Sequence, residues 1–157
     1  MLFLDLTKFL LLAVILPSYV EGACQPGWIH FKTSCYYFST NSLNWQQAST
    51  DCKGRSAQLV SVDTSQENGF IAEEVARVGG SFWFDGTDQD TEGTWIWASS
   101  KELFDFTAWL PHEPSNYEKN EDCLMTQKGY NGQWNDYACY HSIQFICEHA
   151  SNDPPVG

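Results

Sequence analysis

Six cysteines limit what this chain of 157 residues can fold into. They all follow a short apolar run, residues 9–16, which comes after Lys8 and is succeeded by small residues up to Gly22. That pattern is typical of a secretory signal peptide, here residues 1–22. An even number of cysteines behind such a leader predicts three disulfides and a secreted, extracellular protein. Six cysteines can pair in many ways, and their spacing alone selects none of them.

The leader is also the longest apolar stretch of the chain. A membrane-spanning helix needs about 20 apolar residues, and the run here is shorter, so we expect no membrane span. The remainder is long enough to bury the core of one domain, which we place at residues 23–150. Residues 151–157 are predicted to be a flexible tail, because polar residues and prolines follow the last apolar segment.

The charge of the chain is strongly negative, at −12, with 20 acidic and 8 basic residues. Such a chain is not expected to bind nucleic acid or anionic lipid, and it suits cations or neutral partners. Its acidic residues gather in two groups, residues 85–92 and 113–122. An enzyme has little support, since the cysteines are expected in disulfides and no histidine is linked to a recognisable nucleophile.

The apolar pattern predicts two helices among short strands. Trp45, Ala48 and Cys52 fall on one helical stripe, and a second stripe follows the cap residues at positions 64 and 65 and ends before Gly79. Regular patterning fades between residues 98 and 122, which predicts a long irregular loop of the kind that is often functional. Strands are predicted at residues 28–31, 35–38, 59–62, 82–84, 94–97, 123–125, 133–134 and 144–147.

Hard oxygen ligands collect in and after that loop. Three residues can give carboxylate oxygens, one an amide oxygen and one a hydroxyl: Glu113, Glu121, Asp136, Asn135 and Ser115. Calcium takes about 6 to 8 such oxygens and tolerates irregular geometry. Any one of these residues alone is more simply an ordinary solvated loop residue. Together they predict a calcium site with positions left for the hydroxyls of a ligand.

The order of several motifs resembles the C-type lectin-like domain over nearly the whole chain after the leader. The N-terminal cysteine pair resembles the hairpin of the family's long form, and a tryptophan segment stands at the family's W-I-G-L core motif. A Glu-Pro-Ser triplet matches the E-P-N type calcium motif, and Trp-Asn-Asp matches W-N-D. In order, these motifs lie at residues 24–38, 82–88, 113–115 and 134–136.

The resemblance implies an α+β fold, with two helices packed on antiparallel sheets, a long calcium-binding loop and three disulfides. It also implies a cis peptide bond between Glu113 and Pro114. At the W-I-G-L position, Asp85 and Gly86 replace the family's Gly and Leu, which leaves the local packing open. The implied disulfides are Cys24–Cys35, Cys52–Cys147 and Cys123–Cys139.

The resemblance further implies two calcium sites. The principal one would use Glu113, Ser115, Glu121, Asn135 and Asp136, and the same side chains would bind two adjacent sugar hydroxyls. Tyr117 and Tyr137 would lie at the rim of that sugar site, although packing explains them equally well. An auxiliary calcium site would use Asp88, Glu92, Asn116 and Asp122.

Glu113 in this motif implies mannose-type sugars with equatorial 3- and 4-hydroxyls, such as mannose, fucose and N-acetylglucosamine. Ser115 departs from the family's asparagine and leaves the exact preference open. We therefore expect a secreted pattern-recognition lectin of innate immunity that binds glycans on microbial or cell surfaces and pairs into a homo-oligomer through the domain itself. The alternative is a lectin-like protein that binds a non-sugar partner, such as a protein, ice or a mineral surface.

Overall fold

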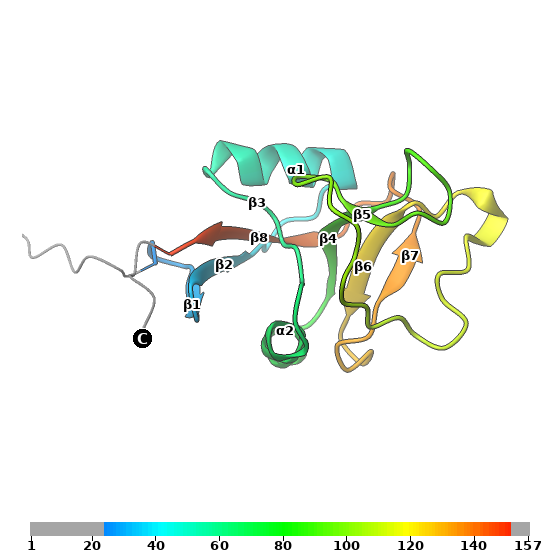
Figure 1. Cartoon of the computed structure of the whole chain (residues 1–157). Coiled ribbons are helices and arrows are strands. Elements are labelled where there is room, and N and C mark those ends of the chain that lie inside the picture. The colour runs from blue at the N-terminus through cyan, green and yellow to red at the C-terminus, as the bar shows by residue number, and fades with distance from the viewer. Residues whose placement is uncertain (1–23, 152–157) are drawn as a thin grey trace, which may run out of the picture.

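The computed structural model describes residues 24–151. The expected leader and nearly all of the expected tail lie outside these residues. Within them the chain forms two α-helices, one short 3-10 helix and eight strands, and Figure 1 shows their arrangement. In chain order these are β1 (Ile29–Phe31), β2 (Ser34–Phe38), α1 (Trp45–Gly54), β3 (Gln58–Leu59), α2 (Ser65–Val78), β4 (Ser81–Thr87), β5 (Ile96–Trp97), η1 (Tyr117–Lys119), β6 (Cys123–Gln127), β7 (Asn135–Tyr137) and β8 (Gln144–Ala150).

The two helices begin and end where local chemistry favours it. The Asn44 side chain accepts from the backbone N–H of Gln47, whose side chain in turn accepts from the Asn44 backbone, and this capping box starts α1. Thr64 accepts from the backbone N–H of Glu67 at the start of α2. Gly79, with φ of 78°, ends that helix in a conformation that glycine adopts easily. The predicted second helix is confirmed at both ends.

The strands form one mixed sheet in the order β1-β2-β8-β4-β6-β7, with β3 paired to β8 and β5 paired to β4. β4 and β8 run parallel, and the other pairs are antiparallel. The helices cover opposite faces of this sheet (Figure 1). Ile71 and Val75 of α2 pack into one apolar cluster, and Trp45, Ala48 and Cys52 of α1 pack into the other. The expected α+β fold is thus confirmed, with one mixed sheet in place of the expected antiparallel sheets.

The departure from the W-I-G-L motif has a packing explanation. A Cβ atom at Gly86 would lie 2.6 Å from the Phe104 ring and 2.7 Å from the Leu124 side chain, so these two residues fill the space that a larger side chain would need. Asp85 beside it is only 2% exposed, and its carboxylate accepts a 2.7 Å hydrogen bond from the Ser99 backbone. Burial raises the pKa of Asp85 to about 6.

The three disulfides are those that the resemblance implies: Cys24–Cys35, Cys52–Cys147 and Cys123–Cys139. Cys52–Cys147 joins α1 to β8 and spans 95 positions of sequence. Cys123–Cys139 joins the start of β6 to the segment after β7. It therefore ties the start of β6, which closely follows Glu121, to the end of β7, which carries Asn135 and Asp136.

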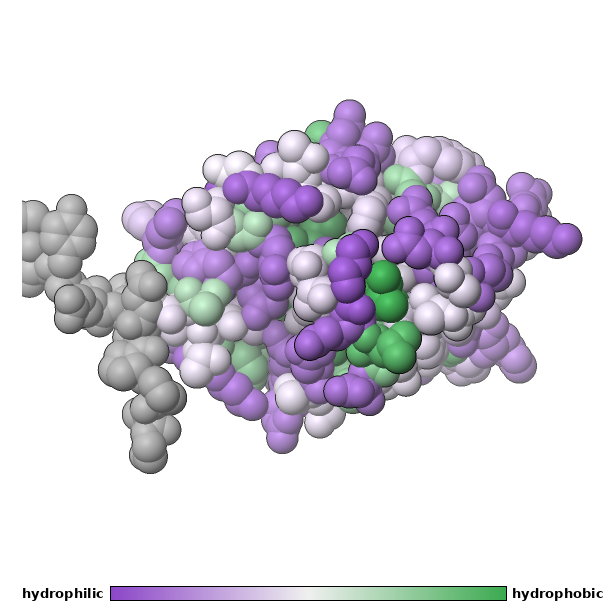
Figure 2. All heavy atoms as spheres, turned by 45° about the horizontal axis from the view of Figure 1, so that its top comes forward, coloured by the Kyte–Doolittle hydropathy of each residue, from purple (hydrophilic) through white to green (hydrophobic). Residues whose placement is uncertain are grey.

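The surface is mainly hydrophilic. Figure 2 shows one face on which polar residues predominate and the apolar area is small. Among residues 24–151, the large apolar side chains that are exposed are Val78, Leu103, Tyr117 and Tyr140. Val78, the last residue of α2, is 43% exposed. The two tyrosines follow closely on predicted calcium ligands in the sequence.

Candidate functional site

The irregular segment between β5 and β6 is confirmed as a long loop, and at its far end it carries the short helix η1 (Figure 1). Its peptide bond between Glu113 and Pro114 is cis, as the resemblance implies. Asn116, Glu118 and Lys119 all have positive φ values, so the backbone coils tightly around η1. This coil turns the backbone N–H groups of the loop toward the acidic residues of the predicted site.

Asp136 is the residue around which this loop closes. Its side chain on β7 is fully buried. One carboxylate oxygen accepts from the backbone N–H of Ser115 at 3.1 Å, and the other accepts from the backbone N–H of Asn116 at 2.6 Å. Asp136 therefore ties the Glu-Pro-Ser segment to the sheet, although the two lie far apart in the sequence.

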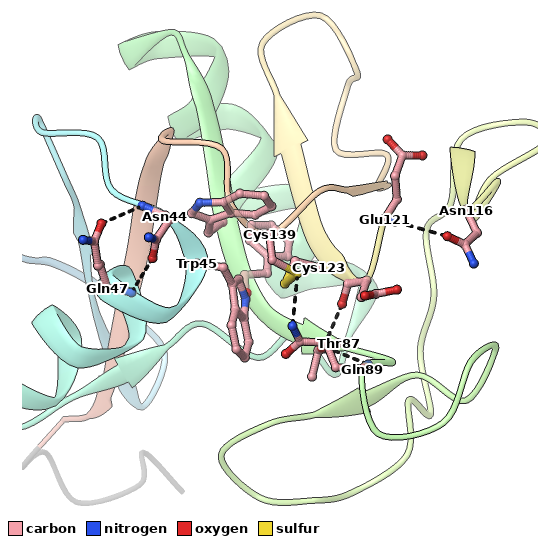
Figure 3. The surroundings of a disulfide bond; sticks show 12 residues. Asn44, Trp45, Gln47, Thr87, Gln89, Asn116, Glu121, Cys123 and Cys139 are labelled. Carbon is pink, nitrogen blue, oxygen red and sulfur yellow. Dashed lines mark hydrogen bonds between the residues drawn. A yellow bond between two sulfur atoms is a disulfide. The ribbon is translucent and has the colours of Figure 1, made fainter. Parts of the chain in front are cut away.

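Glu121 holds the same loop from its other end. Its Oε2 accepts from the Tyr117 backbone N–H at 2.9 Å and from the Ser115 hydroxyl at 3.3 Å. Its own backbone N–H donates to the Asn116 side chain at 3.1 Å, a contact drawn in Figure 3. Glu121 and Asp136 thus both contact the residues that follow Pro114.

Glu113 completes a group of three carboxylates. Its Oε2 is buried and has no hydrogen-bond partner. Burial raises the pKa of Glu113 above its ordinary value, the Ser115 side chain lowers it, and the Asp136 and Glu121 carboxylates raise it further. The three acids are therefore close enough to repel one another, and a cation between them would relieve that repulsion.

The residues present fit a hard cation such as calcium, which prefers oxygen ligands. Glu113 offers an unpaired buried oxygen, whereas Glu121 and Asp136 use oxygens to accept loop N–H groups. Across residues 24–151, no three His, Cys, Asp or Glu side chains already form a metal cluster. Asn135 lies beside Asp136 on β7, and its role stays a prediction.

The four residues of the predicted auxiliary site are also connected to one another. The Asn116 amide donates to a carboxylate oxygen of Glu92, and the backbone N–H of Asp88 donates to the Asp122 carbonyl at 3.3 Å. Asp88 Oδ1 is buried without a partner. The pKa of Asp88 is raised to about 6. Burial is the main cause and the Glu92 and Asp122 carboxylates add to it, while the hydrogen bond from the Gly93 backbone N–H acts in the opposite direction. Occupancy of this site stays a prediction.

The two tyrosines predicted at the rim have different environments. Tyr117 is 68% exposed on η1 and accessible to a ligand. The ring of Tyr137 is half-buried, with its centroid 5.9 Å from that of Trp83 and 4.4 Å from that of His141. Contacts with neighbouring rings therefore cover part of the Tyr137 side chain, whereas most of the Tyr117 side chain is left exposed.

A family model, the lectin C-type domain, matches residues 41–149, which cover the helices, the long loop and the last strands. The chain belongs to the C-type lectin family. This is a carbohydrate-binding family, and its lectin homologues are not enzymes.

Relatives and solved structures agree with this assignment. The chain is 33% identical to C-type lectin domain family 4 member E of Mus musculus. The match covers 82% of this chain and 61% of the length of that relative. It is 31% identical to the mouse scavenger receptor C-type lectin carbohydrate-recognition domain, with a TM-score of 0.77 over 84% of this chain and 100% of that one. A calcium-independent type II antifreeze protein is also similar, at 25% identity and a TM-score of 0.75 over 85% of this chain and 98% of that one.

A second acidic group of this C-type lectin was not predicted from its sequence. It lines a hollow of about 330 Å³ between α2 and the strands β2 and β8. The Tyr36 hydroxyl donates to Glu67 at 2.7 Å, and the Ser34 hydroxyl donates to Glu148 at 2.8 Å. Glu67 and Glu148 are far apart in the sequence and sit at ordinary amphipathic positions, so no local pattern singles them out.

Neither helix within residues 24–151 has the length and apolar character that crossing a membrane would need.

Glu148 gives this C-type lectin a testable pH dependence. Burial raises the pKa of Glu148 from 4.5 to about 7. Between these values the folded state binds more protons than the unfolded state, so stability falls as the pH rises and then levels off above about 7. Glu148→Gln keeps an acceptor for Ser34 and removes the charge. We expect it to raise the free energy of unfolding at pH 8 by up to about 3 kcal/mol, with little change at pH 4.

Urea unfolding with chelator present, at pH 4 and pH 8, measures this effect. The exposed Glu118→Gln is the matched control, because it removes one acidic charge outside the hollow. If Glu148→Gln lost as much stability between the two pH values as the parent, titration of Glu148 would not be the cause.

Proposed function

We propose that this chain is a secreted lectin that binds mannose-type sugars through calcium. The ion would be held by the principal set of five side chains, Glu113, Ser115, Glu121, Asn135 and Asp136. The observation that carries the proposal is the convergence of three carboxylates from the long loop and β7, with a buried, unpaired oxygen on Glu113. Bound calcium would supply open coordination positions for two adjacent sugar hydroxyls.

The protein side chains give the site its selectivity in this proposal. Carboxylate oxygens of Glu113 and Glu121 accept hydrogen bonds from sugar hydroxyls, and the Asn135 amide donates one. Glu113 at the first motif position favours the mannose type over the galactose type. Ser115 is shorter than the usual asparagine, and its hydroxyl already donates to Glu121, so we propose that the site discriminates less sharply among the mannose-type sugars mannose, fucose and N-acetylglucosamine.

The proposed partners are glycans on microbial or cell surfaces, in a pattern-recognition role of innate immunity. Secretion is supported by the predicted leader and by the three disulfides, which persist in oxidising compartments. A single sugar site is usually weak. Pairing of two domains would raise the effective affinity without any new sugar contact, and we propose a small homo-oligomer on that ground.

A second candidate is binding of a non-sugar partner. It is supported by the similarity to the antifreeze protein, which is calcium-independent. In this alternative, the acidic loop itself would contact the partner.

Chromatography on immobilised mannose separates the two candidates. We expect retention in the presence of calcium, elution by a chelator, and no retention on immobilised galactose. Calcium loading is checked by an upward shift of the thermal midpoint, since a ligand that binds only the folded state stabilises it. Flow-through of folded, calcium-loaded protein would refute the sugar proposal and favour the non-sugar partner.

A further inference from the structure

Four ring systems lead from the core of the domain to its surface beside the predicted sugar site. Trp83 is fully buried, and the Tyr137 ring lies against it at 5.9 Å between centroids. The His141 ring stacks on Tyr137 at 4.4 Å, with an angle of 17° between the planes. The Tyr140 ring lies against His141 at 4.4 Å, and Tyr140 is 66% exposed. We refer to the Tyr137, His141 and Tyr140 rings together as the aromatic ledge.

The segment that carries the aromatic ledge is held in place on several sides. The Cys139 sulfur is bonded to Cys123 and receives a 3.6 Å contact from the Gln89 amide (Figure 3). The Cys139 carbonyl accepts from the Trp45 backbone N–H at 3.0 Å. A turn is closed by a 3.1 Å hydrogen bond from the His141 backbone to Ala138. A backbone segment held in this way loses little conformational freedom when a ligand contacts it.

The aromatic ledge begins next to the predicted calcium ligands. Tyr137 directly follows Asp136, and on β7 its side chain shares a face with Asn135. The His141 ring centroid lies 4.4 Å from that of Tyr137 and 4.4 Å from that of Tyr140, so the two tyrosine centroids are no more than about 9 Å apart. An oligosaccharide whose terminal residue meets Asn135 can therefore lay its next residue over the ledge.

We propose that the aromatic ledge is a second carbohydrate subsite, in which Tyr140 contacts the residue next to the terminal sugar of an oligosaccharide. This proposal rests on the proposed function of the calcium site. The C–H face of a pyranose is apolar and fits an exposed aromatic face, while the Tyr140 hydroxyl can donate to or accept from the hydroxyls at its edge. Core packing needs Tyr137, which contacts Trp83, but it does not need the outer ring of Tyr140.

The test compares methyl α-mannoside with a methyl mannobioside on the full, calcium-loaded protein by isothermal titration calorimetry. We expect the disaccharide to bind about 3- to 10-fold more tightly, in the range of one aromatic contact. Tyr140→Ala should bring this ratio close to one. Tyr140→Phe keeps the ring and should restore most of the ratio. Val78→Ala, an exposed apolar residue at the end of α2, is the control and should leave the ratio unchanged.

The failures of the two proposals are distinguishable. A protein that binds the monosaccharide but gains nothing from the disaccharide has a calcium site and no second subsite. A ratio that survives in Tyr140→Ala would likewise overturn the subsite and leave the calcium site standing. If calcium-loaded, folded protein binds neither sugar, the proposed function fails and the subsite fails with it.

Discussion

Replacing Cys52 and Cys147 together by alanine is expected to lower the free energy of unfolding by about 4–5 kcal/mol. The bond closes a loop of 95 positions, so its loss gives the unfolded chain much more conformational freedom. Both sulfurs are fully buried, between α1 and β8, and the double change avoids an unpaired thiol that would exchange with the other disulfides. Urea unfolding at fixed pH, with chelator present, measures the difference.

The Cys24–Cys35 bond provides the matched comparison. It spans only 11 positions, so the same chain-entropy relation gives a loss of about 3 kcal/mol when both cysteines become alanine. The larger loop should also give the larger increase in the denaturant slope, because the unfolded chain without that bond is more expanded. Equal losses for the two pairs would show that the size of the loop does not set the stabilisation.

Much of the fold could be predicted because its signals are local. Thr64 and Gly79 mark the ends of α2 through side-chain capping and a positive φ, and both effects are visible in the sequence. Strand limits were less predictable: residues 59–62 and 94–97 were expected as strands, but only Gln58–Leu59 and Ile96–Trp97 pair. Val60 and Val62 are buried all the same. Apolar sequence therefore predicted burial better than it predicted the limits of the strands.

The contacts around the predicted site could not be predicted from the sequence, and the ligand roles of its residues stay a prediction. The motif residues Glu113, Glu121 and Asp136 do come together, because the loop folds back on β7. No pattern indicated that the loop N–H groups would occupy Asp136, since those bonds depend on the positive φ values around η1. The acidic hollow was missed because Glu67 and Glu148 meet only after α2 packs beside β8. Contacts between distant segments require the tertiary structure.

Asp136→Asn is expected to have the largest effect on function. Under the proposed function it removes one of three carboxylates from the calcium ligands. Loss of a residue that only supports a metal ligand typically lowers metal affinity about 10- to 100-fold, so loss of a ligand charge should exceed about 100-fold. Retention on immobilised mannose should then disappear at calcium concentrations that suffice for the parent. Calorimetric calcium titration and the mannose column measure the two effects.

The same substitution should also destabilise the metal-free protein, for a separate reason. Both oxygens of Asp136 accept backbone N–H groups, from Ser115 and Asn116, and the side chain is fully buried. An asparagine offers one oxygen and one NH₂ group, so one loop N–H loses its acceptor. An unsatisfied donor costs about 1–3 kcal/mol when it is fully buried, and these hydrogen bonds are part-buried, so we expect a loss at the lower end of that range. The free energy of unfolding with chelator present reports this cost independently of calcium.

The control Glu118→Gln distinguishes the loss of a calcium ligand from the loss of a nearby negative charge. Glu118 lies in the same loop, is exposed, and is not one of the proposed ligands, so its substitution should change calcium affinity only slightly. If Asp136→Asn lost stability but kept the calcium affinity and mannose retention of Glu118→Gln, Asp136 would only tie the loop to β7. The carboxylate group would then be a structural link, and the acidic loop would be left for a non-sugar partner.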